Sequence, residues 1–153
     1  MPTSWRIVKA KHASQAFDGE GAREYGGRWN SPGIPMIYTS ATMSLAALEM
    51  LVHLGRSRSL PEYVVFSCRF SESLIESLDR TALPGHWRAY PAPSELAALG
   101  DSWIKRGRSP VLRVPSAVID SESNFLLNPQ HPDFPKIKIS SSEPFQLDLR
   151  LLR

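Results

Sequence analysis

Alternating apolar and polar positions predict short strands along most of the chain. The segment 63–70 gives the strongest signal, because it is rich in β-branched and aromatic residues and carries little charge. The remaining segments are shorter and are separated by proline, glycine and serine. The predicted strands cover residues 5–10, 35–40, 63–70, 109–114, 137–139 and 145–151.

Helical periodicity predicts one helix over residues 42–54. Ser40 or Thr42 is suited to cap its beginning, and Gly55 is suited to end it. Its positions i, i+3, i+4 and i+7 form one stripe that contains a single carboxylate among apolar side chains. The stripe consists of Leu45, Leu48, Glu49 and Val52.

A second helix is predicted over residues 95–106, capped by Ser94 and with Leu96, Leu99 and Trp103 on its inner face. The connecting segments are expected as loops, turns or short helices. They comprise a loop or short helix at 12–24, an irregular stretch at 26–33 with a turn at 30–33, a short helix or turn at 71–78, and loops at 83–87 and 120–135. We therefore expect a single α+β domain over residues 1–153, dominated by short strands.

Composition narrows the class of protein. The chain has 153 residues, of which 42% are apolar and 22% charged, as is usual for a folded soluble domain. No apolar run suits a membrane span, and the N-terminus lacks the apolar centre of a secretory signal, so a cytoplasmic location is expected. The net charge of +3 is too small to indicate nucleic-acid binding. The single cysteine, Cys68, lies in an apolar run and is expected to be a buried thiol.

Several common catalytic motifs are missing. The four histidines show no metal-ligand spacing, and no metal site is expected. The sequence contains neither a Walker loop nor a Gly-x-Gly-x-x-Gly fingerprint. Asn128 and His131 fit polar pocket residues, but Asn-Pro and His-Pro turns explain them equally well.

Three polar side chains of unlike chemistry occur close together in the segment 26–53. Arg28 follows two glycines, so its guanidinium can meet a phosphate closely, or it can simply stack on the surface of Trp29. Tyr38 can stack on a flat ring or serve as a core residue. Glu49 lies on an apolar face and requires a partner such as Arg28, Arg6 or a ligand hydroxyl, unless it is a solvated helix-edge residue. We interpret these residues as the lining of a pocket for an anionic, ring-bearing ligand.

Ser116 follows Pro115 at the end of a predicted strand, where side chains often face a cleft. It is suited to bind a ligand oxygen or to cap a turn. No Gly-x-Ser-x-Gly elbow surrounds it, which argues against a hydrolase nucleophile.

Four ordered motifs resemble the RES-domain toxins of bacterial toxin–antitoxin pairs. They are GGRWNSPGIPMIYTS, SLAALEMLVH, LRVPSAVIDSESNFLLNPQHPDF and FQLDLRLL, and the similarity covers nearly the whole chain. The closing motif departs from the family only at Leu149, where proline is usual. The resemblance implies an ADP-ribosyltransferase-like fold with short, mostly antiparallel strands in a split sheet.

The same resemblance implies an enzyme that uses NAD⁺ as its substrate and needs no further cofactor. Family members degrade NAD⁺ by hydrolysis or phosphorolysis, and some transfer ADP-ribose to a protein. Motif by motif, the catalytic residues are expected to be Arg28, Tyr38, Glu49 and Ser116, with Arg6 and Asn128 as weaker NAD⁺-binding candidates. The implied partner is an Xre-type DNA-binding antitoxin that covers the active site, and the complex allows for a homodimer of the toxin.

The expected chemistry is cleavage of the nicotinamide–ribose bond, with water, phosphate or a protein as acceptor. Glu49 would stabilise the cationic sugar, Arg28 the pyrophosphate, Tyr38 the nicotinamide and Ser116 the ribose or the amide. The first alternative is a transferase that modifies one cellular protein. Two others are a non-enzymatic nucleic-acid module using Trp29, Arg28 and the Arg56/Arg58 group, and an inactive relative that only binds its partner.

Overall fold

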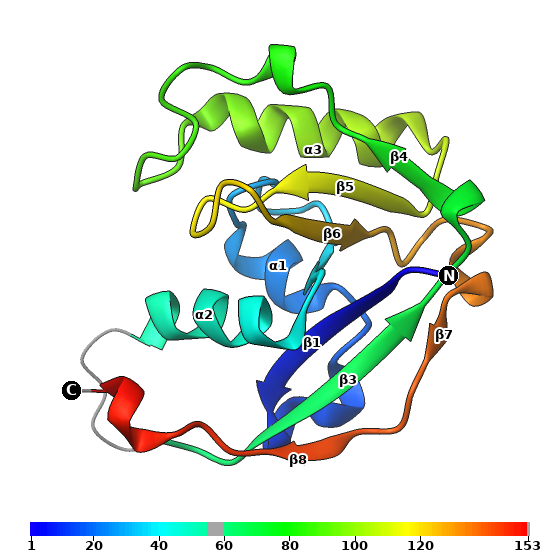
Figure 1. Cartoon of the computed structure of the whole chain (residues 1–153). Helices are drawn as coiled ribbons and strands as arrows, with labels where there is room; N and C mark the ends of the chain where they lie inside the picture. The colour runs from blue at the N-terminus through cyan, green and yellow to red at the C-terminus, as the bar shows by residue number, and fades with distance from the viewer. Residues whose placement is uncertain (55–59, 153) are drawn as a thin grey trace.

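The computed structural model describes residues 1–54 and 60–152, arranged as in Figure 1. Gly55 and the Arg56/Arg58 group therefore lie outside the described residues. The strands are β1 Thr3–Lys9, β2 Ile37–Ser40, β3 Tyr63–Arg69, β4 Ile75–Ser77, β5 Val111–Pro115, β6 Ser123–Leu127, β7 Lys138–Ile139 and β8 Glu143–Phe145. The α-helices are α1 Glu20–Tyr25, α2 Met43–Leu54 and α3 Ser94–Arg106. Short 3₁₀ helices are η1 Ala10–Gln15, η2 Glu72–Leu74, η3 Arg80–Ala82, η4 Phe134–Lys136 and η5 Leu149–Leu152.

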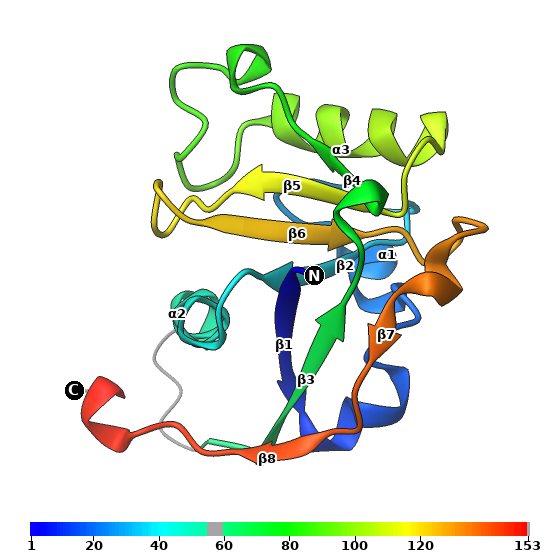
Figure 2. The ribbon, with the colours of Figure 1, turned by 45° about the vertical axis from the view of Figure 1, so that its right-hand side comes forward.

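The described strands form one sheet in the order β4-β5-β6-β2-β1-β3-β7, and β8 pairs with β3 beside this path. All pairs are antiparallel except β4 with β5. β1 pairs with β3 along its whole length but meets β2 only at Trp5↔Ser40. Figure 2 shows β1 and β3 running across the direction of β5 and β6. The sheet is therefore split into two halves at the β1–β2 joint, as expected.

Two hydrophobic clusters hold the layers together. One lies where α3 covers the β4-β5-β6-β2 half (Figure 1) and contains Trp29, Met36, Trp87, Leu96, Trp103, Leu112, Val114 and Leu126. The other contains Ile37, Cys68, Phe70, Val111, Phe125, Leu127 and Ile137. Neighbouring positions of β6 belong to different clusters, because successive side chains of a strand point to opposite faces. This alternation makes β6 a central strand that is covered on both sides.

Helix α2 begins as predicted but presents a different face. The hydroxyl of Thr42 accepts a hydrogen bond from the Leu45 amide at 3.0 Å, which confirms the predicted cap. Leu45 is 1% exposed, whereas Leu48 is 36% and Val52 60% exposed, so the predicted apolar stripe is not the buried face. Periodicity could not show this, because α2 is apolar on both its inner and its outer side. Glu49 is consequently partly exposed rather than enclosed by its stripe.

Several predicted elements need correction. The expected loop 120–135 contains β6, because pairing with β2 and β5 on both edges outweighs the flanking Asn and Ser residues. The expected short helix or turn at 71–78 begins with the short helix η2 but continues as β4, which pairs in parallel with β5. The last predicted strand ends at Phe145, and the η5 residues Leu149 and Leu151 are exposed. Pro93, not Ser94, occupies the cap position of α3.

Candidate functional site

Arg28 lies in a tight turn between α1 and β2. The turn is closed by the Gly27 amide, which donates to the Asn30 carbonyl at 3.0 Å. Its two central side chains diverge: Trp29 is 2% exposed and enters the core, while Arg28 remains partly exposed. A Cβ at Gly27 would lie 2.6 Å from the Tyr38 hydroxyl, so only glycine permits this approach. The core position of Trp29 therefore fixes the direction of Arg28.

The guanidinium of Arg28 has one nitrogen engaged by the protein. Nη1 donates to the carbonyls of Trp87 at 2.9 Å and of Ala89 at 3.1 Å. Within the described part of the chain, Nε and Nη2 have no acceptor. These two nitrogens form a planar edge with two donors, which matches a phosphate or carboxylate. Partial burial lowers the pKa of Arg28, and the charge of Glu49 opposes that shift.

Tyr38, on β2, uses its hydroxyl to hold the Arg28 turn. The hydroxyl accepts from the Trp29 amide at 3.0 Å and donates to Oδ1 of Asn30 at 2.6 Å. Burial raises the pKa of Tyr38. Because both hydrogen bonds of the hydroxyl are internal, Tyr38 has its ring, rather than its oxygen, to offer a ligand.

Glu49 lies in the middle of α2 and is held through one oxygen. Its Oε1 accepts from the Ser116 hydroxyl at 2.7 Å and from Nδ2 of Asn124 at 2.8 Å. Among the described residues, nothing donates to Oε2. Two hydrogen bonds therefore orient the carboxylate, while one oxygen stays ready to accept.

Ser116 differs from its predicted role as a direct ligand contact. It is fully buried, and its oxygen accepts from the amides of Val118 and Ile119, each at 3.1 Å. With both lone pairs occupied, its hydrogen is directed to Glu49. All hydrogen-bonding capacity of the Ser116 hydroxyl is therefore used within the described part of the chain, where it supports the Glu49 carboxylate.

Arg28 and Glu49 share an electrostatic environment without direct contact. In the described part of the chain they form no ion pair, yet Glu49 is the foremost charge that raises the pKa of Arg28. The anion-binding edge of Arg28 and the carboxylate of Glu49 therefore lie close enough for their charges to interact. The arrangement suits a ligand that carries both a phosphate and a hydroxylated, positively charged group.

Arg6 does not join this group. Its Nε donates to the Ala16 carbonyl at 2.7 Å and its Nη1 to the Tyr38 carbonyl at 3.0 Å. Its guanidinium also lies over the ring of Phe17, and burial lowers the pKa of Arg6 to about 10. Arg6 ties η1 and the residues after it to β2, and the sequence-based idea that it contacts Glu49 or NAD⁺ does not fit these contacts.

Asn128 and His131 lie at the opposite end of the β5–β6 hairpin. The backbone amide of Asn128 donates to the Pro110 carbonyl at 2.9 Å. The side-chain Oδ1 of Asn128 accepts from the backbone amide of Gln130 at 3.0 Å. Ser116 follows the other end of β5, where Pro115 pairs with Ser123. Asn128 therefore forms a turn, as the alternative reading had it, and is separated from Glu49 by the length of the hairpin.

Asn124 is the site residue that sequence reasoning missed. It lies near the start of β6, opposite Ser40 of β2 and Val114 of β5. Because this segment was predicted as a loop, no strand register was available to place it beside Glu49. The one signal present was its position directly before the apolar run Phe125–Leu127.

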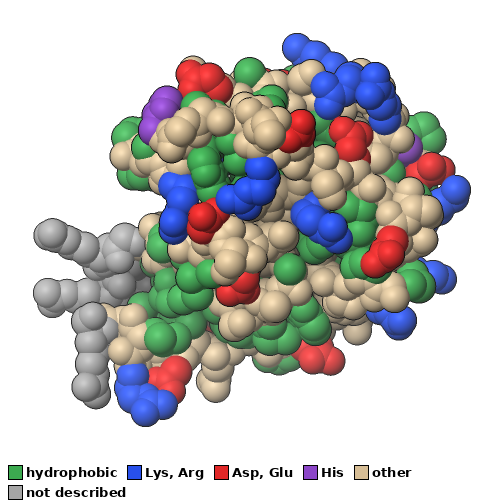
Figure 3. Space-filling model, turned by 45° about the horizontal axis from the view of Figure 1, so that its top comes forward, with side chains coloured by type: hydrophobic (Ala, Val, Ile, Leu, Met, Phe, Trp, Pro, Cys, Tyr) green, Lys and Arg blue, Asp and Glu red, His purple; other side chains and the backbone are tan. Residues whose placement is uncertain are grey.

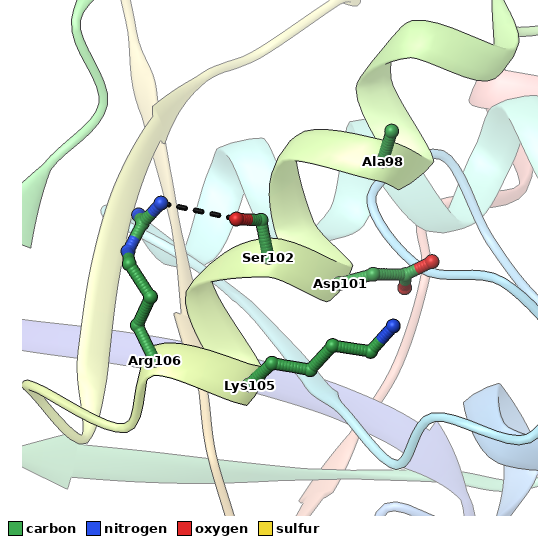
Figure 4. A pocket seen from close by; sticks show the side chains of 5 residues that line it. All are labelled: Ala98, Asp101, Ser102, Lys105 and Arg106. Atoms are coloured by element: carbon green, nitrogen blue, oxygen red, sulfur yellow. Dashed lines mark hydrogen bonds between the residues drawn. The ribbon is translucent and has the colours of Figure 1, made fainter.

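Two hollows of the surface lie elsewhere. One of about 450 Å³ runs along α3, where the side chains of Asp101, Lys105 and Arg106 lie along the helix (Figure 4). A second, of about 250 Å³, lies between α3 and the β4 region and includes Trp103 and Glu76. Neither is lined by Arg28 or Glu49, so the hydrogen bonds and charges at Glu49, not cavity size, define the candidate site. On the face seen in Figure 3, basic and acidic side chains lie together around a hollow above a hydrophobic area.

Membrane-spanning helices and metal-binding clusters are both absent from residues 1–54 and 60–152. No helix there is long and apolar enough to cross a membrane. No group of three or more His, Cys, Asp or Glu side chains in that part of the chain is arranged to hold a metal ion.

Comparison with solved structures identifies the fold. The structure is similar to a chain of the Mycobacterium tuberculosis MbcT–MbcA toxin–antitoxin complex, with a TM-score of 0.78, 19% identity, and coverage of 95% of this chain and 84% of the other. The molecule thus shares the fold of that chain, a mixed domain with a split, mostly antiparallel sheet, and this agrees with the ADP-ribosyltransferase-like fold that the family resemblance implied.

The family follows from sequence. The RES domain model matches residues 3–148. The chain is 39% identical to "Toxin Res" of Yersinia enterocolitica over 149 residues, covering 96% of this chain and 97% of the relative. It is 36% identical to "Prs ADP-ribosylating toxin" of a Sphingobium species over 162 residues, covering 100% of this chain and 99% of the relative. The chain therefore belongs to the RES domain family of toxins, which confirms the resemblance noted from its motifs.

Proposed function

We propose that this chain is the toxin of a toxin–antitoxin pair and that it degrades NAD⁺ by cleaving the bond between nicotinamide and ribose. The observation that supports this most is the Glu49 carboxylate, fixed through Oε1 within the electrostatic reach of Arg28. Membership of the RES family points the same way. A cytoplasmic location and an Xre-type antitoxin partner belong to the same proposal. The likeness to a chain of a toxin–antitoxin complex supports a partner of this kind.

The bond cleavage requires no general acid. When the bond between C1′ of the ribose and the ring nitrogen breaks, the electron pair stays with nicotinamide, which leaves as a neutral molecule. The sugar is left with oxocarbenium-like positive charge. Glu49 opposes that charge and accepts a hydrogen bond from a ribose hydroxyl at Oε2. Water then adds to C1′ and releases one proton to the solvent, giving ADP-ribose; phosphate in place of water gives the phosphorylated sugar.

The other site residues bind and orient the substrate. The Nε–Nη2 edge of Arg28 is suited to the pyrophosphate, because a planar fork contacts two phosphate oxygens at once. The ring of Tyr38 packs against the nicotinamide side of the substrate. Ser116 holds Glu49 and does not contact the sugar itself.

A Glu49→Gln variant tests this function directly. Nicotinamide release from NAD⁺ by the purified chain is measured by chromatography, and we expect turnover to fall by about 100-fold or more, since the charge opposite the sugar is removed. Glu72→Gln, a change of an exposed glutamate in η2, is the matched control and should leave turnover unchanged. A folded Glu49→Gln protein with full turnover contradicts the mechanism.

The second candidate function is transfer of ADP-ribose to a cellular protein. It is favoured by the name of one relative, the "Prs ADP-ribosylating toxin". NAD⁺ labelled in its adenylate part separates the two reactions in a lysate: label on one protein band supports transfer, and free ADP-ribose supports degradation. The nucleic-acid alternative is not favoured, because Trp29, its proposed stacking residue, is buried in the core.

A further inference from the structure

The amide of Asn124 and the hydroxyl of Ser116 converge on the same oxygen of Glu49. Their distances to Oε1 are 2.8 and 2.7 Å. We propose that Asn124 is a positioning residue for Glu49, an inference that rests on the function proposed above. Together with Ser116 it fixes the carboxylate through Oε1 and thereby presents Oε2 to the ribose. Neither the family motifs nor the sequence pattern had singled out Asn124.

The direction of both hydrogen bonds follows from the chemistry of the donors. Ser116 accepts two backbone amides, so its single hydrogen is left for Oε1. The Asn124 amide must turn its NH₂ group toward Glu49, because the opposite orientation would set two acceptor oxygens against each other. Glu49 therefore receives two donors from two different segments, one near the start of strand β6 and one in the loop just after β5.

The oxygen of the Asn124 side-chain amide lowers the stability of the fold. This atom, Oδ1, is buried and has no hydrogen-bond partner within the described part of the chain. A buried acceptor left unpaired destabilises a protein by about 1–3 kcal/mol. An apolar side chain of similar shape would avoid this loss. A residue that served the fold alone would not be expected to be asparagine here, whereas a residue that orients a carboxylate requires its NH₂ group.

Strand register places the amide where this role needs it. Asn124 pairs with Ser40, the last residue of β2, and with Val114 of β5. β2 leads into α2, which carries Glu49, and β5 leads to Ser116. Asn124 therefore lies between the two segments that must stay aligned. A carboxylate that is held by both Ser116 and Asn124 needs little reorganisation when positive charge develops on the sugar.

The test is Asn124→Leu, measured for both catalysis and stability. Loss of one hydrogen bond to a charged group should lower kcat for NAD⁺ cleavage by about 10- to 100-fold, with KM within about threefold of the unchanged protein. The melting temperature should change little, since removal of the unpaired Oδ1 offsets the lost hydrogen bond to Glu49. A structural role would instead lower stability and activity together.

Tyr63→Phe is the matched control, because the Tyr63 hydroxyl is also buried without a hydrogen-bond partner among the described residues, while Tyr63 pairs with Lys9 and Phe145 and not with site residues. It should keep or raise the melting temperature and leave kcat unchanged. The double variant Asn124→Leu with Ser116→Ala should lose less activity than the product of the two single losses, since both donors act on one oxygen.

The outcomes separate this inference from the proposed function. If the unchanged protein neither degrades NAD⁺ nor transfers ADP-ribose, both are overturned. If it is active and Asn124→Leu keeps kcat within threefold, the role of Asn124 alone is overturned. Should the leucine variant not fold, Asn124→Ala is judged by the same kcat criterion. Independent, fully multiplicative losses in the double variant also contradict a shared oxygen.

Discussion

The hydroxyl of Ser116 donates to Oε1 of Glu49 at 2.7 Å and joins residues 67 positions apart in the sequence. The contact links the loop after β5 to the middle of α2. It converts a buried serine and a helical glutamate into one unit, in which the serine determines where the carboxylate points. Ser116 thus supports Glu49 from behind, while Glu49 and Arg28 each keep polar atoms that have no partner among the described residues.

Ser116→Ala should impair both catalysis and folding. The change removes one donor from Glu49 and leaves the amides of Val118 and Ile119 without their acceptor. We expect kcat to fall by about 10- to 100-fold and the free energy of unfolding to fall by about 1–3 kcal/mol. Nicotinamide release and urea denaturation measure the two effects. Ser141→Ala, at an exposed position, should change neither; full activity of Ser116→Ala would show that Glu49 needs no such support.

Arg28→Lys should weaken substrate binding although the charge is kept. A lysine ammonium lacks the planar fork, so it cannot hold the carbonyls of Trp87 and Ala89 and still offer a two-donor edge. We expect KM for NAD⁺ to rise by about 10-fold or more, measured by steady-state kinetics. The same change at Arg69, an exposed residue of β3, serves as control. An unaltered KM in Arg28→Lys would mean that charge alone is sufficient.

Gly100→Ala should destabilise the fold and disturb the Arg28 turn. A Cβ at this position of α3 would overlap the backbone oxygen of Trp29, so the helix or the turn must move. Overpacking of this kind costs about 1–3 kcal/mol or more, above the roughly 1 kcal/mol that alanine gains in a helix. Gly21→Ala in α1 is the matched control, because nothing lies within 4 Å of its Cβ, and it should be neutral or stabilising. Equal melting temperatures for the two variants would contradict the close approach.

Stability should decline at alkaline pH through Cys68. Burial raises the pKa of this thiol from 9.0 to about 11, while the unfolded chain ionises near the ordinary value. The folded state therefore binds more protons between these limits. The contribution is complete below pH 9 and is lost as pH rises toward 11, by up to about 2–3 kcal/mol. Denaturation at several pH values should show a shallower decline in Cys68→Ala than in the unchanged protein; identical slopes would contradict a buried neutral thiol.

The sequence located Arg28 and Glu49 but not the contacts between the parts of the site. Arg28 after two glycines and Glu49 in an apolar helix are local signals, and the structure brings them into one electrostatic environment. Ser116 was found by family motif, and its burial reverses the expected mode of action from ligand contact to support. Arg6 and Asn128 were chosen for their residue type, yet their side chains are bonded internally at other places.

Local chemistry along the chain determined the family, the start of α2 at Thr42, the strong strand β3, and the α+β class. Each of these depends on residues that are neighbours in sequence. The tertiary structure decided which face of α2 is buried, that residues 123–127 form a central strand, and that Asn124 meets Glu49. The physical reason is strand pairing. The register of β6 with β2 and β5 depends on contacts between distant segments, and a single amide reaches Glu49 only when that register is fixed.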